Sequence, residues 1–236
     1  MTEDWDISEF LNSFTVEGYS FDSIASGESS KLLPQNTIYL RHDVDFSIAA
    51  ALEMAEKLYL EGIRSCFFLM LTTPLYNLMD ASGRRAINEL IRMNHDIRLH
   101  FDPTVYRERE INSGLHFELG ILEALSSQPQ NLISFHRPAQ DVIRSQRSYF
   151  GVEHTYMSKY MSEIQYFSDS RGEFRFGHPR DSEEFHMKKS MQILLHPEWW
   201  FCSGTNSLER VTAALDGCKD SLDQWAAANC ALLSST

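Results

Sequence analysis

Two carboxylates stand close together at the end of an apolar run. Asp43 and Asp45 follow the hydrophobic residues 37–40, in the order Arg41-His42-Asp43-Val44-Asp45. In a strand, side chains two positions apart project to the same side, so Arg41, Asp43 and Asp45 would share one face. Carboxylates this close repel each other unless a cation lies beside them. A solvated turn with an Asp helix cap has the same spacing. The chemical interpretation is a carboxylate pair neutralised by Arg41 or by a metal ion.

Four further apolar runs also end in ionisable residues. These residues are His100 with Asp102, His136 with Arg137, Asp169, and His196. Taken alone, a histidine at such a place is more often a hydrogen-bonded structural residue than a ligand. The carboxyl ends of parallel strands, however, meet on one face of an α/β sheet, where ligands bind. The repetition over five runs therefore predicts one reactive site on that face.

Alternating strands and helices are needed to position these residues. Apolar runs predict strands at 37–41, 65–71, 96–101, 132–136, 164–168 and 191–195, and helical spacing predicts helices at 48–61, 85–93 and 114–125. A terminal helix is expected over 207–233, broken near Gly217. This rhythm is typical of βαβ units and a parallel sheet. Residues 1–36, which are polar and acidic, are expected to form a helix and loop on the outside of a domain spanning 37–236.

Composition excludes some partners and compartments. The chain has 236 residues, 43% of them hydrophobic, and a formal charge of -12. Nucleic acid is not an expected partner, because binding phosphates needs concentrated Lys and Arg. No apolar run reaches transmembrane length, and the N-terminus is too acidic for a signal peptide. The four cysteines show no C-x-x-C spacing. We therefore expect a cytoplasmic protein without a transmembrane segment.

Five motifs, taken in order, resemble a known family. They are RHDVD from Arg41, NHDIRLHFD from Asn94, FHRP from Phe135, SDSRG from Ser168 and LLHPEWW from Leu194. Together they resemble the polysaccharide deacetylase superfamily, which is NodB-like and includes carbohydrate esterase family 4. More narrowly, they are similar to a divergent branch with an H-D-V-D motif, met in surface-polysaccharide and lipopolysaccharide biosynthesis. The likeness covers roughly residues 37–201.

This resemblance implies a fold, a metal and a reaction. The fold would be a distorted (β/α) barrel with about seven parallel strands. The reaction would be hydrolysis of an N-acetyl or related acyl group on a sugar, assisted by a divalent metal, usually zinc. Asp43 would be the general base and Asp45 a metal ligand. In most of the family these two are adjacent, whereas Val44 separates them here, so the two roles could be exchanged.

The remaining metal ligands are less regular. His100 matches the first histidine of the family's second motif, but Thr104 stands where the second is expected. The third ligand would then be His136 or Asp102. We expect His136, because zinc accepts imidazole well and an Asp, His, His set leaves one position open for catalysis. If neither residue reaches, the site holds no metal.

The last three roles complete the implied mechanism. Arg137 would orient and charge the base, and Asp169 would polarise His196, the general acid. The expected substrate is an N-acylated sugar or glycan precursor, linked to a nucleotide or a lipid because the chain is expected in the cytoplasm. Two alternatives remain: a metal-independent hydrolase of C-N bonds on the same fold, and a non-catalytic glycan-binding relative.

Overall fold

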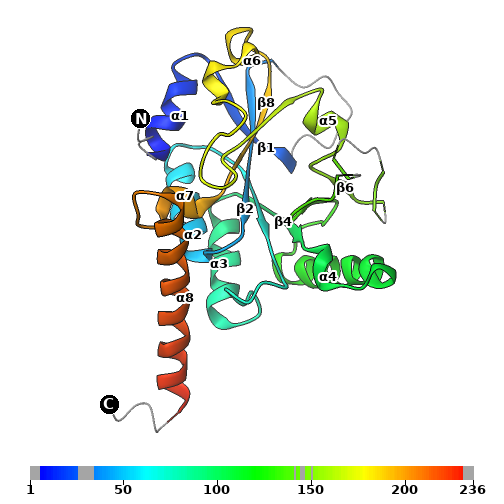
Figure 1. The fold of residues 1–236 in the computed structure, drawn as a ribbon, viewed down its shortest axis with the longest axis vertical. Helices are drawn as coiled ribbons and strands as arrows, with labels where there is room; N and C mark the ends of the chain where they lie inside the picture. Colours follow the sequence, from blue (N-terminus) through cyan, green and yellow to red (C-terminus); the bar gives the residue numbers. More distant parts are fainter. Residues whose placement is uncertain (1–5, 26–34, 141, 144–146, 150, 231–236) are drawn as a thin grey trace.

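The computed structural model describes residues 6–25, 35–140, 142–143, 147–149 and 151–230. Figure 1 shows strands and helices alternating along most of this length. The strands are β1 (Ser20–Ser23), β2 (Thr37–Val44), β3 (Cys66–Leu69), β4 (Asp96–Phe101), β5 (Leu132–Phe135), β6 (Glu153–His154), β7 (Gln165–Ser168) and β8 (Met191–Leu195). The α-helices are α1 (Ile7–Thr15), α2 (Ile48–Leu60), α3 (Ala81–Arg92), α4 (Ile111–Ser126), α5 (Ser158–Met161), α6 (Glu183–His186), α7 (Pro197–Phe201) and α8 (Ser207–Asn229). The short 3-10 helices with described bounds are η2 (Pro103–Val105), η3 (Glu108–Glu110) and η4 (Pro179–Asp181).

The named strands pair in parallel and form one curled sheet. Seven of them follow the order β6-β5-β4-β3-β2-β8-β7, with β2 close to the middle. The sheet curls into a half-barrel with helices around it (Figure 1). The predicted distorted (β/α) barrel of about seven parallel strands is therefore confirmed.

Strand β1 adds an eighth member that the sequence did not predict. It pairs with the first half of β2, from Ser20 opposite Thr37 to Ser23 opposite Leu40, while β3 pairs with the second half. Its sequence, SFDS, is too short and too polar to show the alternation of apolar and polar residues that predicts a strand. The strand is recognised only from the pairing of its backbone with β2. The helix expected in segment 1–36 is α1, and residues 1–5 and 26–34 of that segment lie outside the described residues.

Capping residues set the boundaries of the helices around the sheet. Ser47 accepts a hydrogen bond from the Ala50 N-H at the start of α2. Asp80 does the same for the Gly83 N-H, so α3 begins at Ala81 rather than near residue 85 as predicted. Such caps satisfy backbone donors that a helix leaves unpaired at its first turn. Helices α2 and α3 then pack against each other.

Helix α8 is continuous, and the predicted break near Gly217 is wrong. A glycine in a helix costs only about 1 kcal/mol relative to alanine. Gly217 lies at an exposed position where an added side chain would meet nothing within 4 Å, so neighbouring structure imposes no bend. The helix extends away from the rest of the molecule (Figure 1). The predicted residues 231–233 lie outside the described part of the chain.

Strand β2 carries charged side chains into the interior. All eight of its residues are buried, including Arg41, His42 and Asp43. Because burying a charge is unfavourable unless it is paired, this polar end of the strand must find partners on its neighbours. None of the described helices is both long and apolar enough to span a bilayer.

Candidate active site

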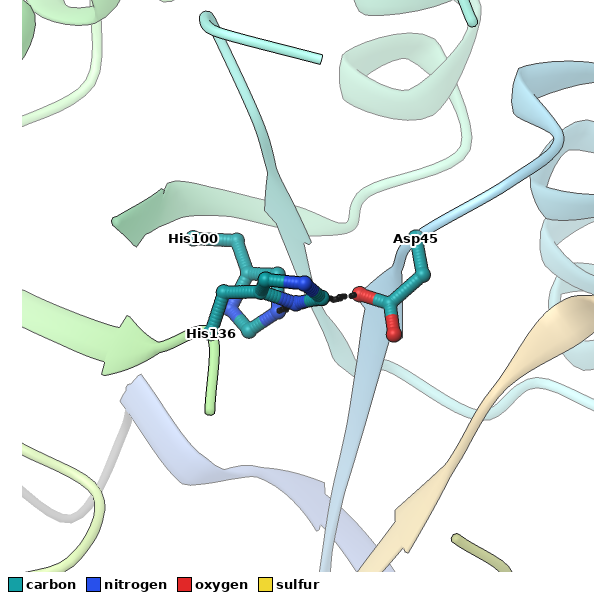
Figure 2. Close-up of side chains that lie close together, drawn as sticks. All are labelled: Asp45, His100 and His136. Atoms are coloured by element: carbon teal, nitrogen blue, oxygen red, sulfur yellow. Dashed lines mark hydrogen bonds and ion pairs between the residues drawn. The ribbon is translucent and has the colours of Figure 1, made fainter. Parts of the chain in front are cut away.

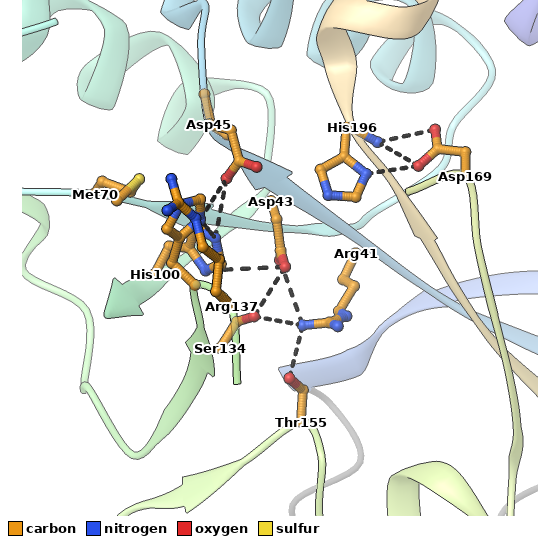
Figure 3. Close-up of polar contacts among 12 residues, drawn as sticks. Arg41, Asp43, Asp45, Met70, His100, Ser134, Arg137, Thr155, Asp169 and His196 are labelled. Atoms are coloured by element: carbon orange, nitrogen blue, oxygen red, sulfur yellow. Dashed lines mark hydrogen bonds and ion pairs between the residues drawn. The ribbon is translucent and has the colours of Figure 1, made fainter. Parts of the chain in front are cut away.

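The predicted site residues lie together at the carboxyl ends of five strands (Figure 3). Asp43 is the penultimate residue of β2, and Asp45 directly follows that strand. His100 lies near the end of β4, and His136, Asp169 and His196 each follow the last residue of β5, β7 and β8. Parallel pairing puts these strand ends on one side of the sheet. The predicted convergence of residues distant in the chain is therefore observed.

Asp45, His100 and His136 form a compact cluster of metal-ligating groups (Figure 2). His100 Nε2 lies 3.0 Å from Asp45 Oδ1, and His136 Nδ1 lies 3.3 Å from the same oxygen. The two histidines are themselves 3.3 Å apart, Nδ1 to Nε2. One ligand atom from each residue lies within 4.8 Å of the others. Two imidazoles and one carboxylate at this spacing suit zinc with an open position.

The ionisation of the residues in this cluster also suits a bound cation. Burial alone would raise the pKa of Asp45, but hydrogen bonds from His100 and His136 hold it well below its usual value. Burial would lower the pKa of His100, but the charges of Asp43 and Asp45 raise it. Without a metal, the cluster therefore favours an ionised carboxylate beside a protonated imidazole. A divalent ion would take the place of that proton.

Asp102, the alternative third ligand, lies outside this cluster. Its Oδ1 accepts hydrogen bonds from the Thr104 N-H at 2.9 Å and from the Thr104 hydroxyl at 2.7 Å. These contacts cap the short helix η2. Thr104, which occupies the position of the missing histidine, therefore helps to close the turn after β4. Within the described residues, the third donor near Asp45 and His100 is His136.

Asp43 is buried beside a fixed cation. Arg41 Nη1 lies 3.3 Å from Asp43 Oδ1, and the Ser134 hydroxyl donates to Asp43 Oδ2 at 2.9 Å. On its other side, Asp43 Oδ2 is 3.8 Å from His100 Nδ1. Asp43 thus links the guanidinium to the metal-ligating cluster, with its carboxylate held from two directions.

The guanidinium of Arg41 is fully enclosed. Its Nη1 also donates to the Ser134 hydroxyl at 2.7 Å and to the Thr155 hydroxyl at 2.6 Å. Three aromatic rings surround it, with centroids 5.6 Å away for Phe68, 5.2 Å for Tyr156 and 5.7 Å for Tyr166. Ring faces attract a cation, so this pocket stabilises the charge that Asp43 faces.

Arg137, predicted to charge the base, occupies another place. Its side chain is exposed, and its Nε donates to His136 Nε2 at 3.1 Å. The backbone at Arg137 has a φ of 52°, so the chain turns sharply directly after β5. Among the described residues, the guanidinium that contacts Asp43 is that of Arg41. Strand periodicity had placed Arg41 on the same side as Asp43, which is the signal that identifies it.

His196 and Asp169 form a tight pair on adjacent strands. His196 Nδ1 lies 2.6 Å from Asp169 Oδ1, and the backbone N-H of His196 donates to both oxygens of the same carboxylate. The indole N-H of Trp200 donates to Asp169 Oδ2 at 2.8 Å. Burial would lower the pKa of His196, but the charge and hydrogen bond of Asp169 raise it to about 10. The imidazole is therefore positioned and protonated.

Four residues near the site had no assigned role in the sequence. Ser134, Thr155 and Trp200 act as hydrogen-bonding partners of the charged groups. Glu198 is fully buried, neither of its oxygens has a hydrogen-bond partner among the described residues, and burial raises its pKa to about 8. Hydroxyls are common in any sequence, so the types of Ser134 and Thr155 gave no signal, whereas Glu198 and Trp200 both lie within the LLHPEWW motif.

Comparisons with known proteins find likeness in fold. No family model and no curated protein sequence matches the chain. Peptidoglycan deacetylase PdaC from Bacillus subtilis is 12% identical with a TM-score of 0.46, covering 83% of this chain and 95% of that one. A family 4 carbohydrate esterase from Streptomyces lividans is 12% identical with a TM-score of 0.45, covering 75% and 86%. A family 4 pseudoenzyme from Bacillus anthracis is 14% identical with a TM-score of 0.41, covering 78% and 60%.

Proposed function

We propose that this chain is a metal-dependent hydrolase of the carbohydrate esterase family 4 type, which removes an N-acetyl or related acyl group from a sugar. The observation that carries the proposal is the layout of the site. A cluster of Asp45, His100 and His136 lies next to a buried carboxylate, Asp43, and near a protonated imidazole, His196. Amide hydrolysis needs this combination of a Lewis acid, a base and an acid.

Asp45, His100 and His136 would hold the metal, most simply zinc. When bound, the ion supplies a Lewis acid that polarises the amide carbonyl. The donor set supports this assignment, since it offers two nitrogens and one oxygen and keeps all three within 4.8 Å of one another. When Nδ1 of His136 holds the ion, the ring proton is on Nε2, so Nε2 would no longer accept the hydrogen bond from Arg137.

Asp43 acts as the general base. It takes a proton from the attacking water while the oxygen of that water forms a bond to the acyl carbon. The cation Arg41 and the hydroxyl of Ser134 keep this carboxylate in place.

His196 acts as the general acid. Its Nδ1 is engaged by Asp169, so Nε2 is the atom that gives a proton to the leaving nitrogen. The C-N bond then breaks, releasing the acid and a free amine on the sugar. Without this proton the nitrogen is a poor leaving group, and the tetrahedral intermediate would return to substrate.

The proposed substrate is a cytoplasmic precursor of a surface polysaccharide or lipopolysaccharide. An N-acetylated sugar carried on a nucleotide or a lipid is the form of such a glycan that a cytoplasmic enzyme would meet. The motif resemblance supports this class. The net charge of -12 fits a small or lipid-linked glycan better than a nucleic acid.

Acetate release from N-acetylated nucleotide sugars tests the proposal. We expect activity that is lost on chelation, returns with zinc, and is absent in Asp43→Asn. Activity that survives with no bound metal would favour a metal-independent C-N hydrolase. Failure to release acetate from any N-acylated glycan, with binding retained, would favour a non-catalytic glycan-binding protein.

A further inference from the structure

Arg137 lies at the rim of the site without serving the proposed base. It directly follows His136 at the end of β5, beside the metal-ligating cluster (Figure 3). The cation that contacts Asp43 is Arg41, whose side chain is fully buried, whereas Arg137 is exposed. A buried guanidinium cannot meet a ligand that arrives from solvent, but a guanidinium at the rim can. The charge of Arg137 is therefore free to serve another partner.

The backbone holds Arg137 in an unusual conformation. Its φ is 52°, in the left-handed region that favours glycine, and it precedes Pro138, before which a residue is normally extended. The backbone N-H of His136 donates to the Phe101 carbonyl oxygen at 2.8 Å, so the chain before this turn is tied to β4. Conformations of this kind are concentrated at functional sites. The turn fixes the point at which the Arg137 side chain leaves the backbone, next to the cluster.

The contact between Arg137 and His136 belongs to the metal-free form of the ring. Arg137 Nε donates to His136 Nε2 at 3.1 Å, while His136 Nδ1 lies 3.3 Å from Asp45 Oδ1. A neutral imidazole has one N-H and one acceptor nitrogen, so these contacts assign the proton to Nδ1. When Nδ1 holds the ion, the proton is on Nε2, and two donors then face each other. Loading the cluster therefore releases the guanidinium from His136.

The guanidinium lies close to where a phosphate of the proposed substrate would be. A single imidazole ring, that of His136, separates it from the atoms that would bind the metal. When a common N-acetylated amino sugar is carried on a nucleotide or a lipid, the phosphate is attached to the anomeric carbon, next to the carbon that bears the amide. With the amide at the cluster, that phosphate is near the rim. A guanidinium matches phosphate oxygens with paired hydrogen bonds.

We propose that Arg137 binds the phosphate on the anomeric carbon of the N-acylated sugar and so selects activated precursors over neutral glycans. This inference rests on the proposed function. It gives Arg137 a part in substrate binding, in place of the role of charging the base that the sequence predicted.

Calorimetric titration of two matched probes into the zinc-loaded full chain tests this role. The probes are glucosamine 1-phosphate and methyl glucosaminide, two amines that differ in the phosphate and are not turned over. Arg137→Gln should weaken binding of the phosphate probe by about tenfold or more and leave the methyl glycoside unchanged. Arg92→Gln is the matched control and should bind both probes as the parent does. It removes the same charge from an exposed residue at the end of α3 that leads into the amino end of β4, opposite the site.

Acetate release distinguishes the two carriers of the phosphate. UDP-N-acetylglucosamine represents the nucleotide carrier, and farnesyl diphospho-N-acetylglucosamine represents the lipid carrier. Arg137→Gln should raise KM with little change in kcat, because the phosphate contact is the same in the ground state and the transition state. A larger effect on one substrate assigns that carrier, and equal effects assign the phosphate alone.

Two results would overturn the proposal. One is a parent chain that binds glucosamine 1-phosphate no more tightly than methyl glucosaminide. The other is a change in Arg137→Gln that is the same for both probes, zero included. Because the titrations involve no turnover, a failure to release acetate would count against the proposed function, while the titrations would still decide the role of Arg137.

Discussion

Arg41 and Asp43 stand two residues apart on the same strand, and their buried side chains meet at 3.3 Å. Such a pair gains little over a well-packed apolar pair, yet losing one partner leaves a charge buried alone. The ion pair that positions the proposed base, Asp43, is therefore also one on which the stability of the fold depends. Ser134 and Thr155 share the guanidinium, so the arrangement ties β2 to β5 and to the segment after β6.

Replacing Arg41 should destabilise the protein and remove its activity. In Arg41→Met, Asp43 stays buried without a cation, a loss of about 3 to 5 kcal/mol of unfolding free energy. Arg41→Lys keeps the charge but not the planar fork, and should retain more of the stability than Met. Denaturant unfolding at neutral pH measures both. The matched control is Arg137→Met, at an exposed site, where we expect a change within about 1 kcal/mol. Similar losses at the two positions would contradict the role of Arg41.

Replacing Asp169 should shift the pH dependence of the reaction. With Asp169 present, the pKa of His196 is raised to about 10, so the general acid stays protonated well above neutral pH. In Asp169→Asn the largest charge that raises the pKa of His196 is gone and burial still lowers it, so the pKa should fall from about 10, while Asp45 and Glu198 still raise it. The falling limb of kcat/KM should therefore move from near pH 10 to a lower pH.

A pH-rate profile of parent and variant measures this shift directly. Asp102→Asn is a suitable control, because it removes another carboxylate on the same rim without touching His196. An unchanged falling limb in Asp169→Asn would mean that His196 is not the acid whose titration limits the rate.

The sequence predicted the location of the site better than its internal contacts. Each strand end could be found because an apolar run stops at an ionisable residue, and parallel strands then bring such ends together. Asp45, His100 and His136 are all found in this way. The choice of His136 over Asp102 as third donor followed from ligand chemistry, and the structure brings His136 into the cluster.

The partner of Asp43 depends on how the sheet curls. Both Arg41 and Arg137 were plausible, since each stands at a strand end. The choice follows from the backbone at Arg137, whose positive φ turns the chain, and from the ring pocket around Arg41. The short strands β1 and β6 escaped prediction because four and two residues are too few to show a period.

Metal binding should depend on pH through His100. The charges of Asp43 and Asp45 raise the pKa of this imidazole, so a proton competes with the metal for its nitrogen. Zinc affinity should fall as the pH drops, by about tenfold per pH unit once His100 is protonated, and binding should release protons. Calorimetry in buffers of different ionisation enthalpy counts those protons.

Ligand identity is tested by the same titration. His136→Ala should weaken zinc binding by more than about 100-fold, because loss of an outer-shell contact alone costs up to that much. Asp102→Ala is the control, since Asp102 caps η2 and lies outside the cluster; its affinity should match the parent. If Asp102→Ala weakened zinc binding and His136→Ala did not, the third ligand would be Asp102.

Glu118, a buried residue of α4, should make the stability of the protein depend on pH. This residue of α4 is 2% exposed, and its Oε1 accepts a hydrogen bond of 2.5 Å from the Tyr106 hydroxyl. Burial raises its pKa from 4.5 to about 7. A raised carboxyl pKa means that the folded state holds the proton more tightly than the unfolded state. Its contribution to stability is therefore complete below pH 4.5 and is lost as the pH rises toward 7.

Glu118→Gln removes this titration while keeping an acceptor for Tyr106. Relative to the parent, the variant should gain roughly 3 kcal/mol of unfolding free energy between pH 4 and pH 8, because each pKa unit corresponds to about 1.4 kcal/mol. Urea unfolding of both proteins across that range measures the difference, and the titration of every other group cancels in the comparison. Glu123→Gln, on the exposed side of the same helix, is the control and should track the parent. A constant difference between Glu118→Gln and the parent at all pH values would show that folding does not raise the pKa of Glu118.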